Sequence, residues 1–193
     1  MSSTSAPFGM NPIRMKSGRF MAVPFAIPDG IASGYGSAIY YGSPVILNTN
    51  GTLTIATTNA DIIGVFAGCQ FVSSSTGLMT PQKNWVASAT YTAGTMVAYV
   101  WNDPDIIYEI QSNGSIAATA VGDQADFVNP GSGNSTLGTS TAQISSTLTG
   151  AGVQGQLRIE GISNKQNNAW GDAYTIVEAS IARHQYVSNK VAI

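Results

Sequence analysis

Residues 45–56 read Val45-Ile46-Leu47-Asn48-Thr49-Asn50-Gly51-Thr52-Leu53-Thr54-Ile55-Ala56. Two β-prone runs flank an Asn-Gly pair, and such a pair accepts the positive φ angles that a tight turn requires. The stretch therefore predicts a β-hairpin, with its two strands on either side of Asn50 and Gly51.

The same reasoning extends along the chain in both directions. Further strands are expected at residues 62–72, 97–101, 106–110, 156–161 and 174–181. Gly64 and Gly68 are expected to be bulges or points of close backbone approach, and Asn102-Asp103-Pro104-Asp105 is expected to form a turn. Residues 115–127 are the one place where a short helix is allowed. Short strands punctuated by Gly, Pro and Asn predict a mainly-β fold, either an antiparallel β-barrel or a sandwich.

The distribution of turn residues divides the chain into four parts. We expect an extended N-terminal arm at 1–25, a β-barrel-like core at 26–128, a Gly/Ser/Thr-rich surface excursion at 129–155, and C-terminal strands at 156–193 that complete the core. No stretch has the length of a transmembrane helix, and the N-terminus lacks the pattern of a signal peptide.

Charged residues make up only 9% of the 193 residues, whereas soluble domains carry about 25%. Lys and Glu are costly to bury at an interface, so a chain poor in them can cover its surface with partners cheaply. The composition thus favours an oligomer or an assembled coat. A net charge of −2 and a pI near 5.1 argue against a nucleic-acid partner.

Residue types that could perform catalysis are scarce. His184 is the single histidine and Cys69 the single cysteine; we expect the histidine at a surface or interface and the cysteine in the core. The Gly-rich stretch at 150–155 lacks the strand-to-helix context of a nucleotide site and is expected to be a loop. Asp103 and Asp105 are explained by the turn, with a loop calcium site as the alternative. We expect no catalytic, cofactor-binding or metal site.

Four sets of residues follow one another along the chain: Phe8-Gly9-Met10-Asn11-Pro12-Ile13; Gly42-Ser43-Pro44-Val45-Ile46-Leu47 with Asp61-Ile62-Ile63-Gly64-Val65-Phe66; Asp103-Pro104-Asp105-Ile106-Ile107-Tyr108-Glu109-Ile110; and Leu157-Arg158-Ile159-Glu160-Gly161 with Trp170-Gly171-Asp172-Ala173-Tyr174 and His184-Gln185-Tyr186. In this order they resemble the small head proteins of tailed bacteriophages, which are called decoration, cement or capsid-stabilising proteins. The excursion at 129–155 has no counterpart in that resemblance.

The resemblance implies a non-catalytic virion protein on the outer surface of the capsid, assembled in the host cytoplasm and needing no cofactor. Its partners would be the major capsid protein and further copies of itself, as a trimer or alternatively a dimer, and neither nucleic acid nor membrane. We expect residues 7–25 to form the capsid-facing or intersubunit arm, so that deleting residues 1–20 would abolish capsid binding without unfolding the core. The candidate partner-binding residues are Phe8, Pro12, Arg14, Arg19, Phe20 and Phe25.

Two other classes of function stay open. The first is a β-sandwich module of a phage tail or fibre that binds a glycan or receptor, in which Trp101 or Trp170 would supply a stacking platform. The second is an enzyme such as a hydrolase, which the scarcity of catalytic residue types makes the weakest alternative.

Overall fold

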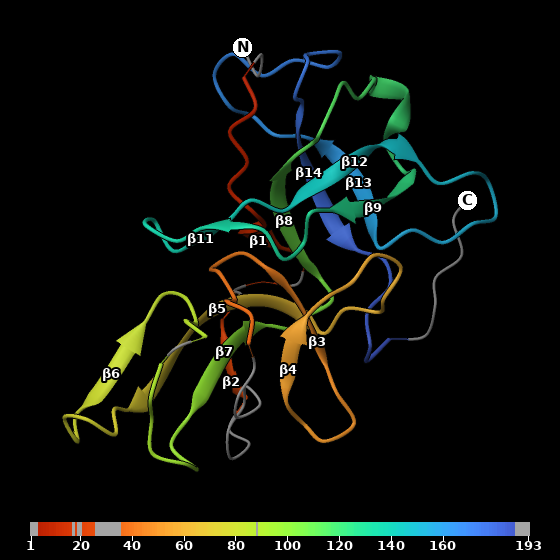
Figure 1. Cartoon of the computed structure of the whole chain (residues 1–193). Helices are drawn as coiled ribbons and strands as arrows, with labels where there is room; N and C mark the ends of the chain where they lie inside the picture. Colours follow the sequence, from red (N-terminus) through yellow and green to blue (C-terminus); the bar gives the residue numbers. More distant parts are fainter. Residues whose placement is uncertain (1–3, 17, 19–20, 26–35, 88, 188–193) are drawn as a thin grey trace.

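The computed structural model of the chain describes residues 4–16, 18, 21–25, 36–87 and 89–187 (Figure 1). Two six-stranded antiparallel sheets dominate it, and we call them sheet A and sheet B. The strands form a sandwich-like arrangement and no closed barrel, so the predicted mainly-β antiparallel fold is confirmed in its sandwich form.

Sheet A contains strands from both ends of the chain. Its order is β1 (Asn11–Met15), β8 (Ile106–Gln111), β14 (Ile176–Ile181), β13 (Leu157–Ile162), β9 (Gln124–Val128) and β12 (Gln143–Leu148). Sheet B is built from the intervening residues. Its order is β2 (Val23–Phe25), β7 (Val97–Trp101), β5 (Gly64–Val72), β3 (Pro44–Leu47) and β4 (Leu53–Ile55), with β6 (Met79–Gln82) paired to the outer part of β5.

The hairpin predicted around Asn50-Gly51 is confirmed as β3 and β4, which pair Val45 with Ile55. Gly51 has φ of +82°, a value that favours glycine. The side-chain oxygen of Asn50 accepts hydrogen bonds from the amide and hydroxyl of Thr52. The Asn side chain therefore fixes the turn in the way that the sequence pattern predicts.

The predicted turn at residues 102–105 is also confirmed: the carboxylate of Asp103 accepts a 2.8 Å hydrogen bond from the amide of Asp105. It joins β7 of sheet B to β8 of sheet A. Gly64, predicted to be a close-approach point, lies where a Cβ would come within 2.2 Å of the Trp101 carbonyl oxygen. Gly68 lies at a register shift between β5 and β7, as expected of a bulge.

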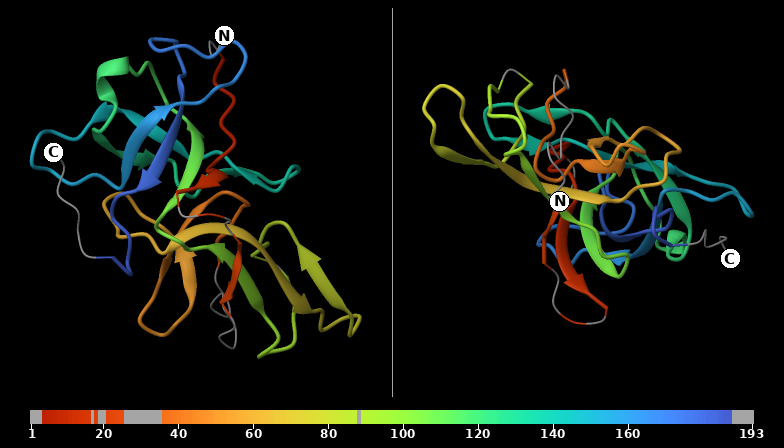
Figure 2. Two further views of the ribbon diagram at one scale, coloured as in Figure 1. Left: turned by 180° about the vertical axis from the view of Figure 1, so that it is seen from behind. Right: turned by 90° about the horizontal axis from the view of Figure 1, so that it is seen from below.

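Two hydrophobic clusters fill the interior. Cluster 1 lies under the inner face of sheet A, and Val65 and Trp101 of sheet B also belong to it. Cluster 2 lies on the opposite face of sheet B and contains Phe66 and Trp85. Because successive strand residues point to opposite faces, Val65 and Phe66 of β5 serve different clusters. Sheet B is thus packed on both faces near its junction with sheet A (Figure 2).

The N-terminal segment differs from the expected free arm. β1 pairs with β8 as an edge strand of sheet A, and Met10 just before it is fully buried in cluster 1. The Met10 amide also donates a 2.9 Å hydrogen bond to the carbonyl of Gly42, next to sheet B. Residues 10–15 are therefore part of the core, and deleting residues 1–20 would remove a strand and a buried side chain.

The expected excursion at 129–155 also differs from the structure. It contains the small hairpin of β10 (Gly133–Asn134) and β11 (Thr139–Ser140), followed by β12, the far edge of sheet A. Ile144 of β12 is fully buried. The composition concealed this strand because Ser and Thr fill three of its six positions. The helix allowed at 115–127 is one 3-10 turn, η1 (Ala118–Ala120), and β9 follows it.

Candidate functional site

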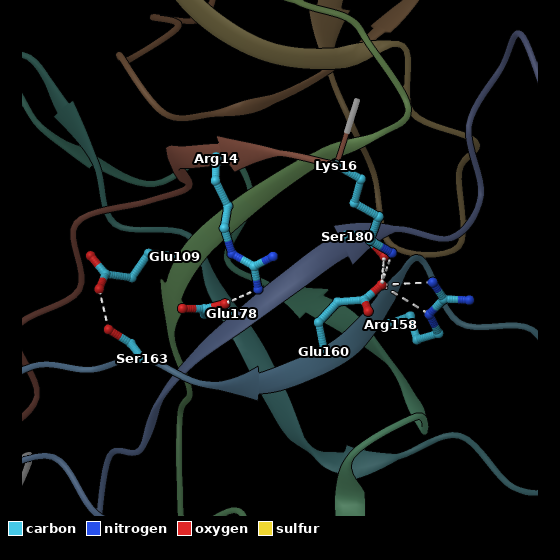
Figure 3. A network of polar contacts seen from close by, with 8 residues as sticks. All are labelled: Arg14, Lys16, Glu109, Arg158, Glu160, Ser163, Glu178 and Ser180. Carbon is cyan, nitrogen blue, oxygen red and sulfur yellow. Dashed lines mark hydrogen bonds and ion pairs between the residues drawn. The ribbon is translucent and has the colours of Figure 1, made fainter. Parts of the chain in front are cut away.

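A polar face with paired charges covers sheet A on the side away from cluster 1. Leu157 and Ile159 of β13 point into cluster 1, so Arg158 and Glu160 between and beyond them point outward. The same alternation on β14 places Glu178 and Ser180 outward. Figure 3 shows Glu178 meeting Arg14 of β1, and Glu160 meeting Lys16, which directly follows β1; Glu109 of β8 contacts Ser163 separately.

Glu160 is the hub of this face. Its Oε1 accepts hydrogen bonds from Lys16 Nζ at 3.0 Å, Arg158 at 2.6 Å and the Ser180 hydroxyl at 2.6 Å (Figure 3). Partial burial alone would raise its pKa, but these hydrogen bonds and the charge of Arg158 outweigh burial and lower the pKa to about 2. The carboxylate is held ionised, with several donors on its Oε1, which is unfavourable for a general acid or base working near neutral pH.

The other two glutamates are engaged in the same way. Glu178 forms a 2.5 Å ion pair with Arg14. Glu109, whose side chain is 8% exposed, pairs with Lys165 at 2.5 Å and accepts a short hydrogen bond from the Ser163 hydroxyl. A fifth ion pair joins Arg183 to Asp61 at 2.7 Å. The ionic groups therefore stabilise one another across strands.

The structure places the candidate partner-binding residues unevenly. Phe8 is half-buried, with the Lys165 ammonium 4.4 Å from its ring centre. Pro12 is buried opposite Tyr108, whereas the Arg14 side chain is 54% exposed beside Glu178.

Phe8, Pro12 and Arg14 thus lie along one edge of sheet A. Arg19 and Phe20 lie outside the described residues. Phe25 ends β2 in the other sheet, and its side chain also lies outside the described part.

His184 was predicted at a surface or interface, and this was wrong: it is 3% exposed. Its Nε2 lies 2.8 Å from the carbonyl oxygen of Asn102, and its Nδ1 accepts a 3.1 Å hydrogen bond from the Tyr186 amide. With Nδ1 an acceptor and Nε2 facing a carbonyl, the neutral Nε2-protonated tautomer satisfies both contacts. The ring connects the C-terminal segment to the turn between the sheets. Cys69 is buried as predicted, and burial raises the pKa of its thiol to about 12.

The tryptophans do not form an exposed platform within the described residues. Trp101 is 9% exposed and packs edge-on against Tyr41, and Trp85 is 1% exposed in cluster 2. Trp170 is partly buried against cluster 1. A cavity of about 370 Å³ beside Trp85 is lined by Tyr91, Thr90 and several alanines. The two aromatic rings there pack on each other edge-to-face, 5.6 Å apart, as core residues do.

Groups of acidic, histidine or cysteine side chains with the makings of a metal site are absent from the described parts of the chain. The stretch at 150–155 lies in the loop between β12 and β13, as expected. Its Gly155 passes so close to β9 that a Cβ would lie 2.8 Å from the amide nitrogen of Ala125. This glycine is explained by packing.

Comparison with known proteins identifies no relative: no family model, no curated protein and no solved structure matches the chain. In the part of the chain that the structure describes, no helix has the length and hydropathy needed to cross a bilayer.

One surface feature was not predicted from the sequence, the apolar tip of the β5–β6 hairpin. Leu78 is 68% exposed and Met79 is 65% exposed. They directly follow Ser73-Ser74-Ser75-Thr76-Gly77, a run of turn residues. The signal available in the sequence was an apolar pair placed immediately after such a turn.

Proposed function

We propose that this protein is a structural component of a tailed-phage virion, a decoration or cement protein that binds the outer surface of the capsid and stabilises it. The proposal includes the major capsid protein and further copies of this chain as partners, a non-enzymatic role, and a location on the particle surface. A glycan- or receptor-binding module of the tail is the alternative; the burial of Trp101 and the partial burial of Trp170 against cluster 1 do not favour it.

The observation that carries the proposal is the uneven distribution of charged residues along the chain, which leaves one long stretch almost without them. Between residues 36 and 101 the only charged side chains are Asp61 and Lys83. Asp61 pairs with Arg183, and the Lys83 ammonium lies 5.1 Å above the Tyr41 ring centre and donates to the Leu137 carbonyl. A surface without free charge can be covered by protein at a low desolvation cost.

The mechanical argument follows from repetition. A capsid filled with DNA is under outward pressure, and a protein that bridges neighbouring subunits resists their separation, because separation would expose its buried apolar surface. Each Å² of apolar surface contributes about 25 cal/mol, and a standard interface buries about 800 Å² on each partner. A contact of that size, repeated over a lattice, adds a large total stabilisation.

The decisive experiment adds the purified chain back to particles that lack it. Virions are produced with and without the gene; labelled antibody is then located by electron microscopy, and DNA retention is measured during heating. We expect label over the head and a lower release temperature for particles without the protein, reversed by adding the chain back. Label on the tail alone would support the alternative, and no label on particles would refute both.

The N-terminal binding residues can be tested with matched variants. Arg14→Ala and Arg183→Ala each remove one partly exposed ion pair, and each should change stability by less than about 1 kcal/mol. If the edge formed by Phe8, Pro12 and Arg14 faces the capsid, only Arg14→Ala weakens binding in the add-back assay. Equal binding by the two variants would place the capsid contact elsewhere.

A further inference from the structure

The outer part of sheet B carries an uncovered face that the polar network does not account for. Phe71 and Cys69 of β5 point into cluster 2, so Gln70 and Val72 point to the opposite side. Register extends this side onto the neighbouring strands. Val72 lies opposite Met79 and Gln70 opposite Pro81 on β6, and Gln70 also lies opposite Val97 on β7.

With Tyr99 of β7, these side chains form what we call the neutral face: Gln70, Val72, Met79, Pro81, Val97 and Tyr99. None of the six belongs to either cluster or packs against one. In Figures 1 and 2 the outer part of β5 and the whole of β6 extend beyond sheet A, so sheet A does not cover them. Met79 and Pro81 are exposed, and the other four are partly exposed.

Gln70 lies in the middle of the neutral face, between Pro81 and Val97, with mostly apolar side chains around it and no charged one. The adjacent Leu78 adds a second exposed apolar side chain at the tip. Lys83, the charged residue nearest in sequence, directly follows β6. Its ammonium contacts the Tyr41 ring and the Leu137 carbonyl. Exposed apolar side chains gathered on one sheet face are typical of an interaction surface.

Because the neutral face carries no charged side chain, a second copy of this chain is a compatible occupant. In a symmetric oligomer related by a twofold axis the same patch meets itself, so a patch carrying one sign of charge would repel its copy. A neutral face meets no such repulsion. Contact through the strand edge is disfavoured because Pro81 lacks the amide hydrogen that a further strand would need. The contact that fits is therefore face to face, which closes after two copies.

We propose that the neutral face is the surface through which two copies of this chain associate, with Gln70 near its middle and the exposed Met79 and Leu78 toward the hairpin tip. This rests on the proposed assembly role, because it names the surface through which a capsid-bound protein contacts its own kind. Self-association is thereby assigned to the β5–β6 hairpin, whereas the sequence predicted that residues 7–25 form the capsid-facing or intersubunit arm.

The test is sedimentation equilibrium on the purified full chain and two matched variants. Met79→Lys puts a charge at a 65% exposed apolar position of the face, which the second copy would have to bury. Val153→Lys puts the same charge at a 55% exposed position in the loop between β12 and β13. We expect a dimer for the wild type and for Val153→Lys, and at least a tenfold higher dissociation constant for Met79→Lys, with unchanged circular dichroism for all three.

Other outcomes overturn the inference. A monomeric wild type at all concentrations would do so, as would equal dissociation of the two variants or an undisturbed Met79→Lys dimer. A monomer whose capsid binding is lost only in Met79→Lys would assign the neutral face to the capsid. A dimer that fails to bind capsids would leave the inference standing and remove the proposed function, so the two failures are distinguishable.

Discussion

At the scale of single residues, amide side chains make hydrogen bonds to strand backbone that a neighbouring strand would otherwise make. The Gln185 side chain accepts a hydrogen bond from the Leu47 amide at 2.8 Å and donates one to its carbonyl at 3.0 Å. Asn168 makes the same pair of contacts with Ile176. An amide carries a donor and an acceptor side by side, as a peptide group does. The uncharged polar residues of this chain thus complete backbone pairing where no strand is available.

Gln156 provides a sharp test of this role. It is fully buried, and its side chain donates to the carbonyls of Thr57 and Ala60 near sheet B and accepts from the amide of Phe127 in sheet A. Gln156→Leu keeps a similar volume but leaves these backbone groups unpaired. We expect a loss of about 3 kcal/mol in the free energy of unfolding, measured by urea denaturation.

The control for this substitution is Gln166→Ala in the exposed turn between β13 and β14. A surface change of this kind should stay within about 0.5 kcal/mol of the wild type. Similar stabilities for Gln156→Leu and Gln166→Ala would mean that the buried amide does not connect the sheets energetically.

Glu160 predicts how stability depends on acidity. Its pKa of about 2 lies below the ordinary value of 4.5, so folding favours the ionised form. The stabilisation is complete above about pH 4.5 and is lost as the pH falls toward 2. Glu160→Gln should therefore be less stable than wild type at pH 7, by on the order of 1 kcal/mol because solvent screens the group. The difference between the two should shrink in urea titrations below pH 4.

Asp105→Asn in the exposed turn at 102–105 is the matched carboxylate control. It removes an exposed carboxylate that forms no ion pair among the described residues, so the stability of this variant should stay within about 0.5 kcal/mol of the wild type. A difference between wild type and Glu160→Gln that stays constant down to pH 2.5 would contradict the role assigned to Glu160.

At the scale of elements, β1 decides whether the N-terminal segment is an appendage or part of the core. Two methionines separate these alternatives, because Met10 is fully buried whereas Met21 is 71% exposed. We expect Met10→Ala to cost about 2–5 kcal/mol, through lost burial and the cavity left behind. Met21→Ala should change stability by less than about 0.5 kcal/mol. Equal thermal midpoints for the two variants would restore the view of a free arm.

Local sequence patterns predict the elements whose signal lies within a few residues. The Asn50-Gly51 hairpin and the Asp103-Pro104 turn are examples, because backbone conformation and side-chain bonding determine them locally. β12 was missed because its inward positions hold few large residues and its Ser and Thr resemble a loop. Its assignment depends on pairing with β9, which lies in a separate stretch of the chain.

The polar face of sheet A depends even more on contacts between residues that are distant in sequence. The scarcity of charge is visible in the composition, but the partners of Glu160 come from β13, from β14 and from Lys16, which directly follows β1. No local pattern could place Lys16 beside a glutamate 144 residues later in the chain. The burial of His184 was missed for a related reason, since Asn102, 82 residues away, covers its ring.

At the scale of the whole molecule, two features connect the two sheets. Strand β5 contributes side chains to both clusters, and the Gln156 side chain bonds to backbone groups near both sheets. Trp85 lies in cluster 2 and Trp101 in cluster 1, so tryptophan fluorescence reports on both. We expect one cooperative transition in urea, with fluorescence and far-ultraviolet circular dichroism changing together. Separate midpoints for Trp85→Phe and Trp101→Phe variants, each made in a Trp170→Phe background so that one tryptophan remains, would show that the two sheets unfold independently.

The position of β14 in sheet A determines when the fold can be completed during synthesis. β14 is the last of the described strands to leave the ribosome, yet it lies between β8 and β13 and pairs with both. Until residues 176–181 emerge, β8 lacks its neighbour on that side. It can pair only with β1, which is synthesised much earlier. A nascent chain therefore cannot complete sheet A before residues 176–181 have emerged.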